Sequence, residues 1–555
     1  MQDKRFKSWV KSGSPWVWFT GAAIAISMIM VVGLLLLIAA RGMGYFWPGD
    51  VYQFEYAEPG KPTITVMGEI YDEEVINAQQ LSDQGIVLPD DVTKVTRYLV
   101  KTGNRDVYGL DFRWLIKNFI SKQSKPENAL IAERREWGNF YGTIVSVREN
   151  QVLVGKGEEA WPEINQRIEY TNDIHSQATS IERGAIGSIN HKMEKLRLQQ
   201  RQFELDNEAT PDNLGMLDKQ RAELNEKYQL LQAELNKLYA KMKRDTITVR
   251  TAEGKEIALP LQQVIHIWQP NSMSNFAKIK HYVQALWAFV AGEPREANTE
   301  GGIFPAIFGT VMMVITMSIF VTPFGVIAAV YLREYAKQGA VTRLVRIAVN
   351  NLAGVPSIVY GVFGLGFFVY FLGGNIDQLF FPEALPAPTF GTPGILWSSL
   401  TLAILTVPVV IVATEEGLSR IPRNVREGSL ALGATKWETL WKTIIPMASP
   451  AIMTGLILAI ARAAGEVAPL MLVGVVKLAP TLPLDGNMPF VHLDRKFMHL
   501  GFHIYDVGFQ SPNVEAARPL VYATALLLIL VIIVLNLAAI AIRNRLREKY
   551  KALDQ

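Results

Sequence analysis

The chain has 555 residues and carries 55 Lys plus Arg against 52 Asp plus Glu, so its formal charge is only +3. This balance does not indicate nucleic acid or any other polyanion as a partner. Hydrophobic residues make up 49% and charged residues 19% of the chain, which excludes an intrinsically disordered protein and disfavours a fully soluble one. The absence of cysteine excludes disulfides, thiolate catalysis and Cys-ligated metal centres.

Long apolar segments dominate the chain and predict six membrane-spanning helices, because about 20 residues are needed to cross the hydrocarbon core. The segments are 16–40, 303–332, 347–376, 384–414 (mostly apolar from 395 to 413), 443–476 and 520–542. Buried helices of a soluble protein are the alternative, but these runs are too long for it. The first run also exceeds the apolar part of a signal peptide, so we expect a membrane anchor.

Lysine and arginine mark one side of the predicted bundle. They are abundant in segments 333–346 and 415–442, after residue 542, and before the first span at Lys4, Arg5, Lys7 and Lys11, whereas loop 373–394 has none. Cytoplasmic loops are rich in Lys and Arg, so both termini are predicted to be cytoplasmic in a bacterial inner membrane. Loops 42–302, 373–394 and 477–517 then lie outside the cytoplasm.

The predicted domains follow from this topology. Residues 1–41 form the cytoplasmic N-terminus and first span, 42–302 an extracytoplasmic insert, 303–547 a five-helix core, and 548–555 a cytoplasmic tail. Long domains are translocated regardless of their charge, so the charged insert does not contradict this arrangement. Within the insert, alternation of apolar and polar residues predicts strands over 62–70, 141–154, 246–250 and 257–268.

A helical stretch over about 174–244 interrupts these strands. Its apolar residues repeat with alternating spacings of three and four, the pattern of a coiled-coil seam: Leu217, Leu224, Tyr228, Leu231, Leu235, Leu238 and Met242, with Ile189, Met193, Leu196, Gln200 and Phe203 upstream. A break at 210–213 divides it into an antiparallel hairpin with arms of about 30 residues, roughly 45 Å long. The hairpin is either a docking arm for an extracytoplasmic partner or a spacer that associates with itself.

No catalytic constellation emerges from the sequence. Phosphate-binding P-loop, zinc-protease and nucleophile-elbow motifs are all absent. His499 and His503 are four residues apart and could share a helix face, but they lack a clear third ligand. We therefore predict no metal site, and interpret both histidines as ordinary polar residues of a loop.

The loop before the fifth span, residues 415–446, has a more specific pattern. Pro422 can open a short helix over 425–432, and Gly433 suits the residue that ends it. Thr435 and Glu438 form a capping-box pattern that starts a second helix leading into the span. Such an element can be gripped by a soluble partner and move a membrane helix. The alternative is an amphipathic connector lying on the membrane surface.

This loop resembles the EAA coupling loop of ABC-importer permeases. In that family the pattern is Glu-Ala-Ala, three residues, Gly, nine residues and Ile-x-Leu-Pro. The matching positions are Glu427, Gly428, Ser429, Gly433, Ala434 and Pro446, with Gly428 and Ser429 replacing the two alanines. The resemblance implies that residues 415–446 contact separate ATP-binding subunits.

Three further stretches resemble phosphate-specific permeases of this class: 302–335, 351–365 and 461–470. Ala-Pro-Leu at 468–470 favours the PstA-type subunit, although Val467 replaces the usual Thr. The resemblance covers 302–547 closely and 16–40 loosely, and the insert 42–302 is far longer than the usual loop. It implies an all-α type I importer permease fold with an α+β insert and no cofactor. It also implies a PstC-type second permease subunit, two ATP-binding subunits and an extracytoplasmic phosphate-binding protein.

Arg462 and Glu466 are the charged residues of the fifth span. A charge at the bilayer centre costs about 2.5–3.5 kcal/mol, so something must offset it. The two residues are four apart and could pair on one helix face. Arg462 could instead contact passing phosphate, because its planar guanidinium binds two oxygens at once, with Glu466 orienting it. The resemblance favours this second interpretation, since phosphate permeases carry an Arg and a Glu in this motif.

The sequence therefore predicts the permease subunit of a phosphate importer. A permease for sulfate, molybdate or another oxyanion would share the coupling loop and differ in stretches 351–365 and 461–470. A membrane-anchored sensor or scaffold acting through the coiled-coil insert would leave five further spans unexplained. A membrane enzyme is a third alternative, for which no site was found.

Overall fold

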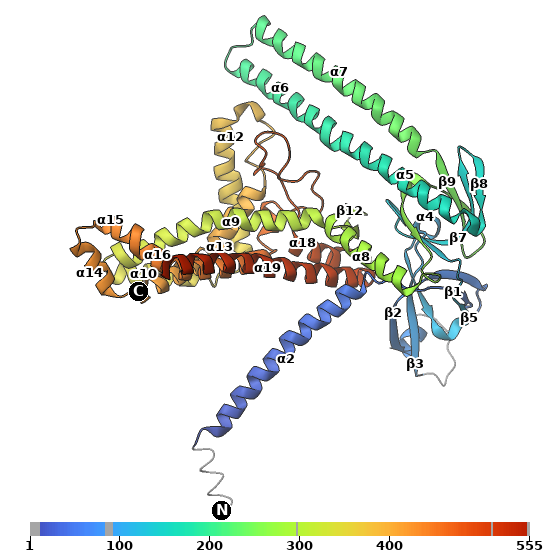
Figure 1. Cartoon of the computed structure of the whole chain (residues 1–555), viewed down its shortest axis with the longest axis horizontal. Coiled ribbons are helices and arrows are strands. Elements are labelled where there is room, and N and C mark those ends of the chain that lie inside the picture. The colour runs from blue at the N-terminus through green and yellow to red at the C-terminus, as the bar shows by residue number, and fades with distance from the viewer. Residues whose placement is uncertain (1–11, 84–92, 296–297, 512–513, 552–555) are drawn as a thin grey trace, which may run out of the picture.

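The computed structural model describes residues 12–83, 93–295, 298–511 and 514–551 (Figure 1). The basic residues Lys4, Arg5, Lys7 and Lys11, and the last residues of the tail, lie outside these ranges. A helical bundle forms one part of the molecule, and two β-sheets lie at one end of it (Figure 1). A long helical hairpin extends from the sheets along the side of the bundle.

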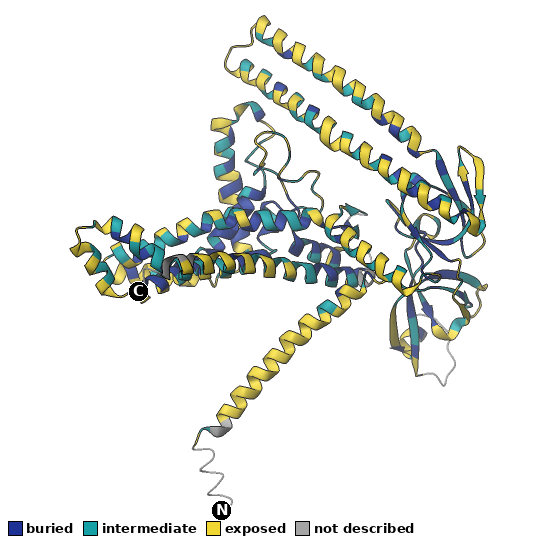
Figure 2. Cartoon of the chain, in the orientation of Figure 1, coloured by how far each residue is buried: buried dark blue, intermediate teal, exposed yellow. Residues whose placement is uncertain are grey.

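Six helical segments of the described chain are long and apolar enough to cross a membrane. Five of them include single long helices: α2 (Ser14–Gly44), α9 (Phe304–Val330), α13 (Ile395–Arg420), α16 (Ile445–Gly465) and α19 (Val514–Lys551). The sixth consists of α11 (Ser357–Phe363), a π-helical segment (Gly364–Gly373) and α12 (Gly374–Phe380). Helices α9, α13 and α16 pack around a shared apolar core, whereas α2 is exposed along its membrane segment (Figure 2).

The third span begins later than predicted. The uncharged run from 347 does not form one helix, because an amphipathic helix, α10 (Ala340–Leu352), ends before Gly354 and Pro356. Proline disfavours helical conformation in the preceding residue and donates no backbone hydrogen bond, so the chain turns here before α11 starts. The prediction of a single helix over 347–376 was therefore wrong at its first turns.

The fifth span also differs from the prediction. It starts at α15 (Lys436–Thr439), continues through a π-helical segment (Leu440–Ile444) into α16, and ends at Gly465 instead of continuing to Val476. Glu466 is extended, and a short helix, α17 (Leu470–Val473), follows. The apolar sequence after Glu466 therefore does not continue α16 but forms a turn and this short helix.

The insert contains two antiparallel sheets. The first has the order β4-β3-β2-β1-β5 and the second the order β10-β9-β7-β6-β11, with β8 paired to β7. The strands of the first sheet are β1 (Val51–Tyr56), β2 (Ile64–Asn77), β3 (Lys94–Lys101), β4 (Phe112–Ile116) and β5 (Ile120–Ser124). Those of the second are β6 (Leu130–Arg134), β7 (Phe140–Glu149), β8 (Val152–Lys156), β9 (Asp245–Arg250), β10 (Glu256–Pro260) and β11 (Val264–Trp268).

Shorter elements complete the insert. They are α3 (Ala78–Ser82), α4 (Arg105–Tyr108), α8 (Asn275–Ala291), β12 (Pro294–Arg295) and β13 (Glu300–Gly301), together with the helices of the hairpin. The single strand predicted over 141–154 is a two-strand hairpin, since Asn150 and Gln151 adopt positive φ angles of 46° and 71° between β7 and β8. Two residues with positive φ form the turn that best fits the twist of paired strands. The run 257–268 likewise divides into β10 and β11.

The helical hairpin consists of α5 (Trp161–Ser180), a π-helical segment (Ile181–Ile186), α6 (Gly187–Leu205) and α7 (Pro211–Met242). Its first arm begins at Trp161, earlier than predicted. Thr210 caps α7 by accepting a hydrogen bond from the backbone N–H of Asn213. The residues of the predicted seam are buried or half-buried between the arms, and the polar member Gln200 accepts a hydrogen bond of 2.6 Å from Arg221.

One side of the hairpin contacts the bundle. Helix α6 packs against the loop turn Pro382–Ala384, and the His191 ring meets the His492 ring edge to face at 6.1 Å. His492 lies 2.9 Å from Asp485, which also pairs with Arg495 at 2.7 Å. Burial opposes ionisation of Asp485, but hydrogen bonds from the Asn487 backbone, Arg495 and His492 hold its pKa below the ordinary value. The hairpin thus contacts a loop of the bundle that carries this cluster of charged residues.

Candidate functional site

The centre of the candidate site is the turn that follows α16. Arg462 lies in the last turn of the helix and Glu466 just beyond it, and their charged groups are 3.5 Å apart. The predicted pairing is therefore present, but not on one helix face, because α16 ends between the two residues. The side chains of Arg462 and Glu466 keep 32% and 20% of their surface exposed, so both remain accessible from one side.

The fold brings two distant sequence stretches together at this turn. Gly361, in the 351–365 stretch, packs so closely that an added Cβ would lie 2.7 Å from Cα of Pro469, in the 461–470 stretch. A Cβ on Gly364 would meet the Thr401 hydroxyl of α13 at 2.2 Å. Both glycines therefore permit close helix contact, whereas Gly366 has open space around it.

A short helix, α18 (Leu500–Tyr505), supports the turn from the opposite side. An added Cβ on Gly501 would lie 2.8 Å from the Val467 side chain, so the two segments are in direct contact. The Thr310 hydroxyl of α9 accepts a hydrogen bond of 3.0 Å from the Leu500 backbone, which fixes the start of α18. The Arg462–Glu466 turn is thus held between α11 and α18.

His499 and His503 lie on this supporting element, and they are not the ordinary loop residues that the sequence predicted. They are only 1% and 2% exposed. His499 accepts a hydrogen bond from the Phe502 backbone through Nδ1, while neither ring nitrogen of His503 has a hydrogen-bond partner among the described residues. Lys477 and Asp506 form an ion pair of 2.9 Å nearby. No cluster able to hold a metal ion occurs in the described part of the chain.

Burial keeps both histidines neutral. It lowers the pKa of His499 to about 4, partly offset by the neighbouring Ala464 carbonyl, and lowers the pKa of His503 to about 4 together with the charge of Lys477. In the unfolded chain a histidine titrates near 6.5, so the unfolded state takes up protons first as the pH falls. Stability is therefore lost as the pH falls from about 6.5 towards 4.

We expect His503→Gln to weaken this pH dependence. Each histidine should cost roughly 2 kcal/mol of stability at pH 5, because one pKa unit corresponds to about 1.4 kcal/mol. The measurement is the midpoint of thermal unfolding of the purified complex at pH 7 and pH 5. The midpoint should fall less on acidification in the variant than in the wild type. An equal fall in both proteins would show that His503 is not buried in its neutral form.

Loop 415–446 has the predicted helix–turn–helix form. Helix α14 (Arg423–Ala431) starts after Pro422, and Gly433 follows it with a φ of 86°. The capping box of Thr435 and Glu438 is present, with the Thr435 hydroxyl accepting from the Glu438 backbone and the Glu438 carboxylate from the Thr435 backbone.

The individual residues of the EAA-like pattern have different settings. Glu427, Gly428 and Gly433 are exposed, whereas Ala434 and Pro446 are half-buried. The Ser429 hydroxyl lies 2.9 Å from that of Thr439, which ties α14 to α15. Leu432 is 91% exposed, and Trp437 and Trp441 are 64% and 61% exposed and stacked on each other. The loop therefore presents an apolar surface outward.

Sequence reasoning did not identify the contact that ties this loop to the second span. Arg426 of α14 donates to the Glu334 carboxylate at 2.8 Å and to the carbonyls of Leu418 and Ile421. Glu334 lies in the π-helical segment Tyr331–Tyr335 that ends α9. Both charged side chains are largely buried, so their pairing is energetically significant. A charged residue at the end of an apolar run was the only sequence signal available.

Exchanging the two charges tests this connection. Glu334→Arg or Arg426→Glu alone should each destabilise the protein strongly, because a largely buried charge loses its partner at a cost of about 3–5 kcal/mol. The double variant Glu334→Arg/Arg426→Glu should recover part of the stability, measured as the midpoint of thermal unfolding. If the double variant is as defective as the sum of the single ones, the two residues do not act as a pair.

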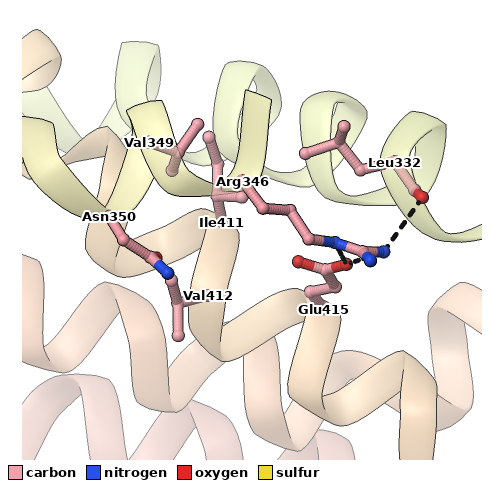
Figure 3. Close-up of a pocket in the computed structure, with 7 residues that line it drawn as sticks. All are labelled: Leu332, Arg346, Val349, Asn350, Ile411, Val412 and Glu415. Atoms are coloured by element: carbon pink, nitrogen blue, oxygen red, sulfur yellow. Dashed lines mark hydrogen bonds and ion pairs between the residues drawn. The ribbon is translucent and has the colours of Figure 1, made fainter. Parts of the chain in front are cut away.

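A second ion pair lies beside this one. Arg346 of α10 donates to Glu415 of α13 at 2.7 Å and to the Leu332 carbonyl at 3.3 Å (Figure 3). These residues line a small pocket, together with Val349, Asn350, Ile411 and Val412 (Figure 3). The pocket therefore marks the place where α10, α13 and the end of α9 contact one another.

Comparisons with known proteins identify relatives of this chain. The family described as binding-protein-dependent transport system inner membrane component matches residues 321–550. The phosphate transport system permease protein PstA 1 of Mycobacterium tuberculosis is 36% identical over 247 residues, which cover 44% of this chain and 71% of the relative. A probable phosphate transport system permease protein PstA of Methanocaldococcus jannaschii is 31% identical over 221 residues, covering 39% and 67%.

A likeness to solved structures was also found. A chain of the MetNI methionine ABC transporter, in an inward-facing conformation, matches with 17% sequence identity and a TM-score of 0.33. The match covers 49% of this chain and 99% of that chain.

Proposed function

This chain belongs to the PstA family of phosphate transport permeases, and from that premise we propose that it forms one half of the pore of an ATP-driven phosphate importer. It is a transport component, and ATP hydrolysis belongs to separate subunits. A PstC-type permease subunit would complete the pore, and an extracytoplasmic binding protein would deliver phosphate. The complex would lie in the bacterial inner membrane.

One observation carries this proposal. Two stretches about 100 residues apart, 351–365 and 461–470, meet around the Arg462–Glu466 pair through the contact of Gly361 with Pro469. Arg462 is partly exposed and lies 3.5 Å from Glu466, and a guanidinium has five N–H donors, more than this one contact would use. Arg462 would contact phosphate through its guanidinium, and Glu466 would orient it and limit how tightly phosphate is held.

The coupling loop would transmit the work of ATP hydrolysis. Two ATP-binding subunits would grip residues 415–446 through the exposed Leu432, Trp437 and Trp441. Their movement would pass through Arg426 and Glu334 into α9, and through α15 directly into α16, which carries Arg462 at its other end. Switching the pore between outward and inward access would follow as a shift between two conformations.

The topology of the importer is part of the proposal. The coupling loop, α10 and the C-terminal end of α19 lie at one end of the bundle, and the sheets lie at the other (Figure 1). The basic residues of the coupling loop, α10 and α19 are therefore at the end away from the sheets. This end would be cytoplasmic, as would both termini. The insert 42–302 would then be periplasmic. Its coiled-coil hairpin would be a docking arm for the binding protein, with self-association as the alternative.

Uptake of labelled phosphate tests the cargo. Cells starved of phosphate should lose phosphate uptake when the gene is deleted and regain it when the gene is restored, while sulfate and molybdate uptake stay unchanged. Loss of uptake of a different anion would support the permease function but contradict phosphate as the cargo. A purified complex without ATP-binding subunits would instead favour a sensor or scaffold that acts through the insert.

A further inference from the structure

Helix α8 carries an unusual apolar stripe where the insert joins the bundle. Phe276, Ile279, Val283 and Trp287 are 80%, 51%, 58% and 71% exposed. Their spacing of three, four and four residues places them on one face of the helix. Single exposed apolar residues are common, but four large ones in a row mark a surface that something covers.

The opposite face of α8 is fixed to the ends of two membrane helices. Phe289 and Tyr282 pack against Phe46, which follows α2, with ring centroids 5.0 and 6.5 Å apart. The Ile303 backbone donates to the Phe289 carbonyl at 2.8 Å, immediately before α9 begins. The C-terminal end of α8 is therefore held at the level where α2 and α9 leave the apolar part of the bundle.

The exposed stripe continues into the outer surface of α9. Phe304, at the first residue of α9, is 39% exposed, and Ile315 and Ile319 further along are 51% and 65% exposed. In a membrane-spanning helix, exposed apolar side chains of this kind face lipid. The charged segment that contains β12 and β13 joins α8 to α9, and the Phe304 backbone donates to the Gly292 carbonyl at 3.1 Å, so the end of α8 lies next to the start of α9.

The composition of α8 fits a membrane surface better than a protein partner. Trp287 lies near the C-terminal end of α8, and the half-exposed Trp47 follows the end of α2. Tryptophan is enriched at membrane–water interfaces. Lys280 is exposed beside the stripe, and a lysine can extend its ammonium group to lipid phosphates while its stem covers apolar surface. A helix with one apolar face flanked by lysine and tryptophan is typical of helices that lie in the interface.

We infer that α8 lies in the membrane interface and buries Phe276, Ile279, Val283 and Trp287 among the phospholipids. This role is additional to phosphate transport and does not depend on the identity of the cargo. Lys278 connects α8 to the sheets through an ion pair of 2.8 Å with Asp50, which also pairs with Lys125 at 2.7 Å. The lipid contact would therefore hold the insert at a fixed height and orientation above the pore.

The absence of cysteine makes this inference directly testable. Val283→Cys and Phe276→Cys, each labelled with an environment-sensitive fluorophore, would be reconstituted as the complete complex in nanodiscs of phosphatidylcholine and phosphatidylglycerol. Both labels should lose most of their fluorescence when the lipids carry brominated acyl chains. Ile319→Cys on α9 is the positive control, and Leu230→Cys, which is 67% exposed on the hairpin, is the matched control that should not respond.

Two outcomes would overturn the inference. Quenching of the labels at 283 and 276 by aqueous iodide, without quenching by brominated lipid, would place the stripe in water. Protection from both quenchers would show that another protein subunit covers it. Because both positions are exposed, the substitutions should not disturb folding, and the measurement does not depend on transport activity.

Discussion

Replacing Arg462 with alanine should lower phosphate uptake by about 10- to 100-fold, because hydrogen bonds to a charged group contribute about 1.5–3 kcal/mol. The variant also leaves Glu466 without its partner at 3.5 Å, so an unpaired carboxylate would then face a passing anion. Arg462→Lys should be intermediate, since it retains the charge and loses the planar fork. The measurement is labelled phosphate uptake, normalised to the amount of assembled complex in the membrane.

A matched control separates the loss of one arginine from a defect in assembly. Arg250 on β9 also pairs with a nearby glutamate, Glu256, at 2.7 Å, and Arg250→Ala should leave uptake unchanged. If Arg462→Ala transports normally while the complex is present in its usual amount, Arg462 has no role in the path. The pair with Glu466 would then be a structural contact that offsets two charges near the membrane.

Gly433→Val should separate ATP hydrolysis from transport. Gly433 has a φ of 86°, and the left-handed conformation costs a residue with a Cβ roughly 1–2 kcal/mol. A Cβ there would meet no atom within 4 Å, so the expected defect arises from the backbone turn and not from a clash. The phosphate transported per ATP hydrolysed should fall about tenfold, because 1.4 kcal/mol corresponds to a factor of ten.

Gly254 provides the control for this substitution. It has nearly the same φ, 87°, and equally open surroundings, but it lies in the turn between β9 and β10. Gly254→Val therefore imposes the same backbone strain away from the coupling loop and should leave the transport ratio unchanged. Normal coupling in Gly433→Val would mean that the turn between α14 and α15 does not transmit the movement.

Most of the membrane architecture could be predicted from the sequence. A segment must form a long apolar helix to cross the bilayer, so each span can be recognised from its composition. The helix–turn–helix form of the loop could also be predicted, because a capping box and a helix-terminating glycine depend only on residues three or four apart. The prediction failed where composition alone was used, at the starts and ends of the third and fifth spans.

The insert was harder to predict for a physical reason. Strands such as β10 and β11 look like one apolar run, and only their pairing with different neighbours, β9 and β6, separates them. The hairpin was visible because a helical repeat is local, whereas the order of strands in a sheet depends on contacts far apart in the chain. Several strands of the first sheet were missed for this reason.

The sequence by itself determined the six apolar spans, the coupling loop and the presence of Arg462 and Glu466. Only the tertiary structure decided that α16 ends between these two residues, that Gly361 and Gly501 bring α11 and α18 to either side of the turn, and that His499 and His503 are buried behind it. It also paired Arg426 with Glu334. Apolar length and caps act between neighbours in the chain, while burial and ion pairing depend on which distant segments the packing brings together.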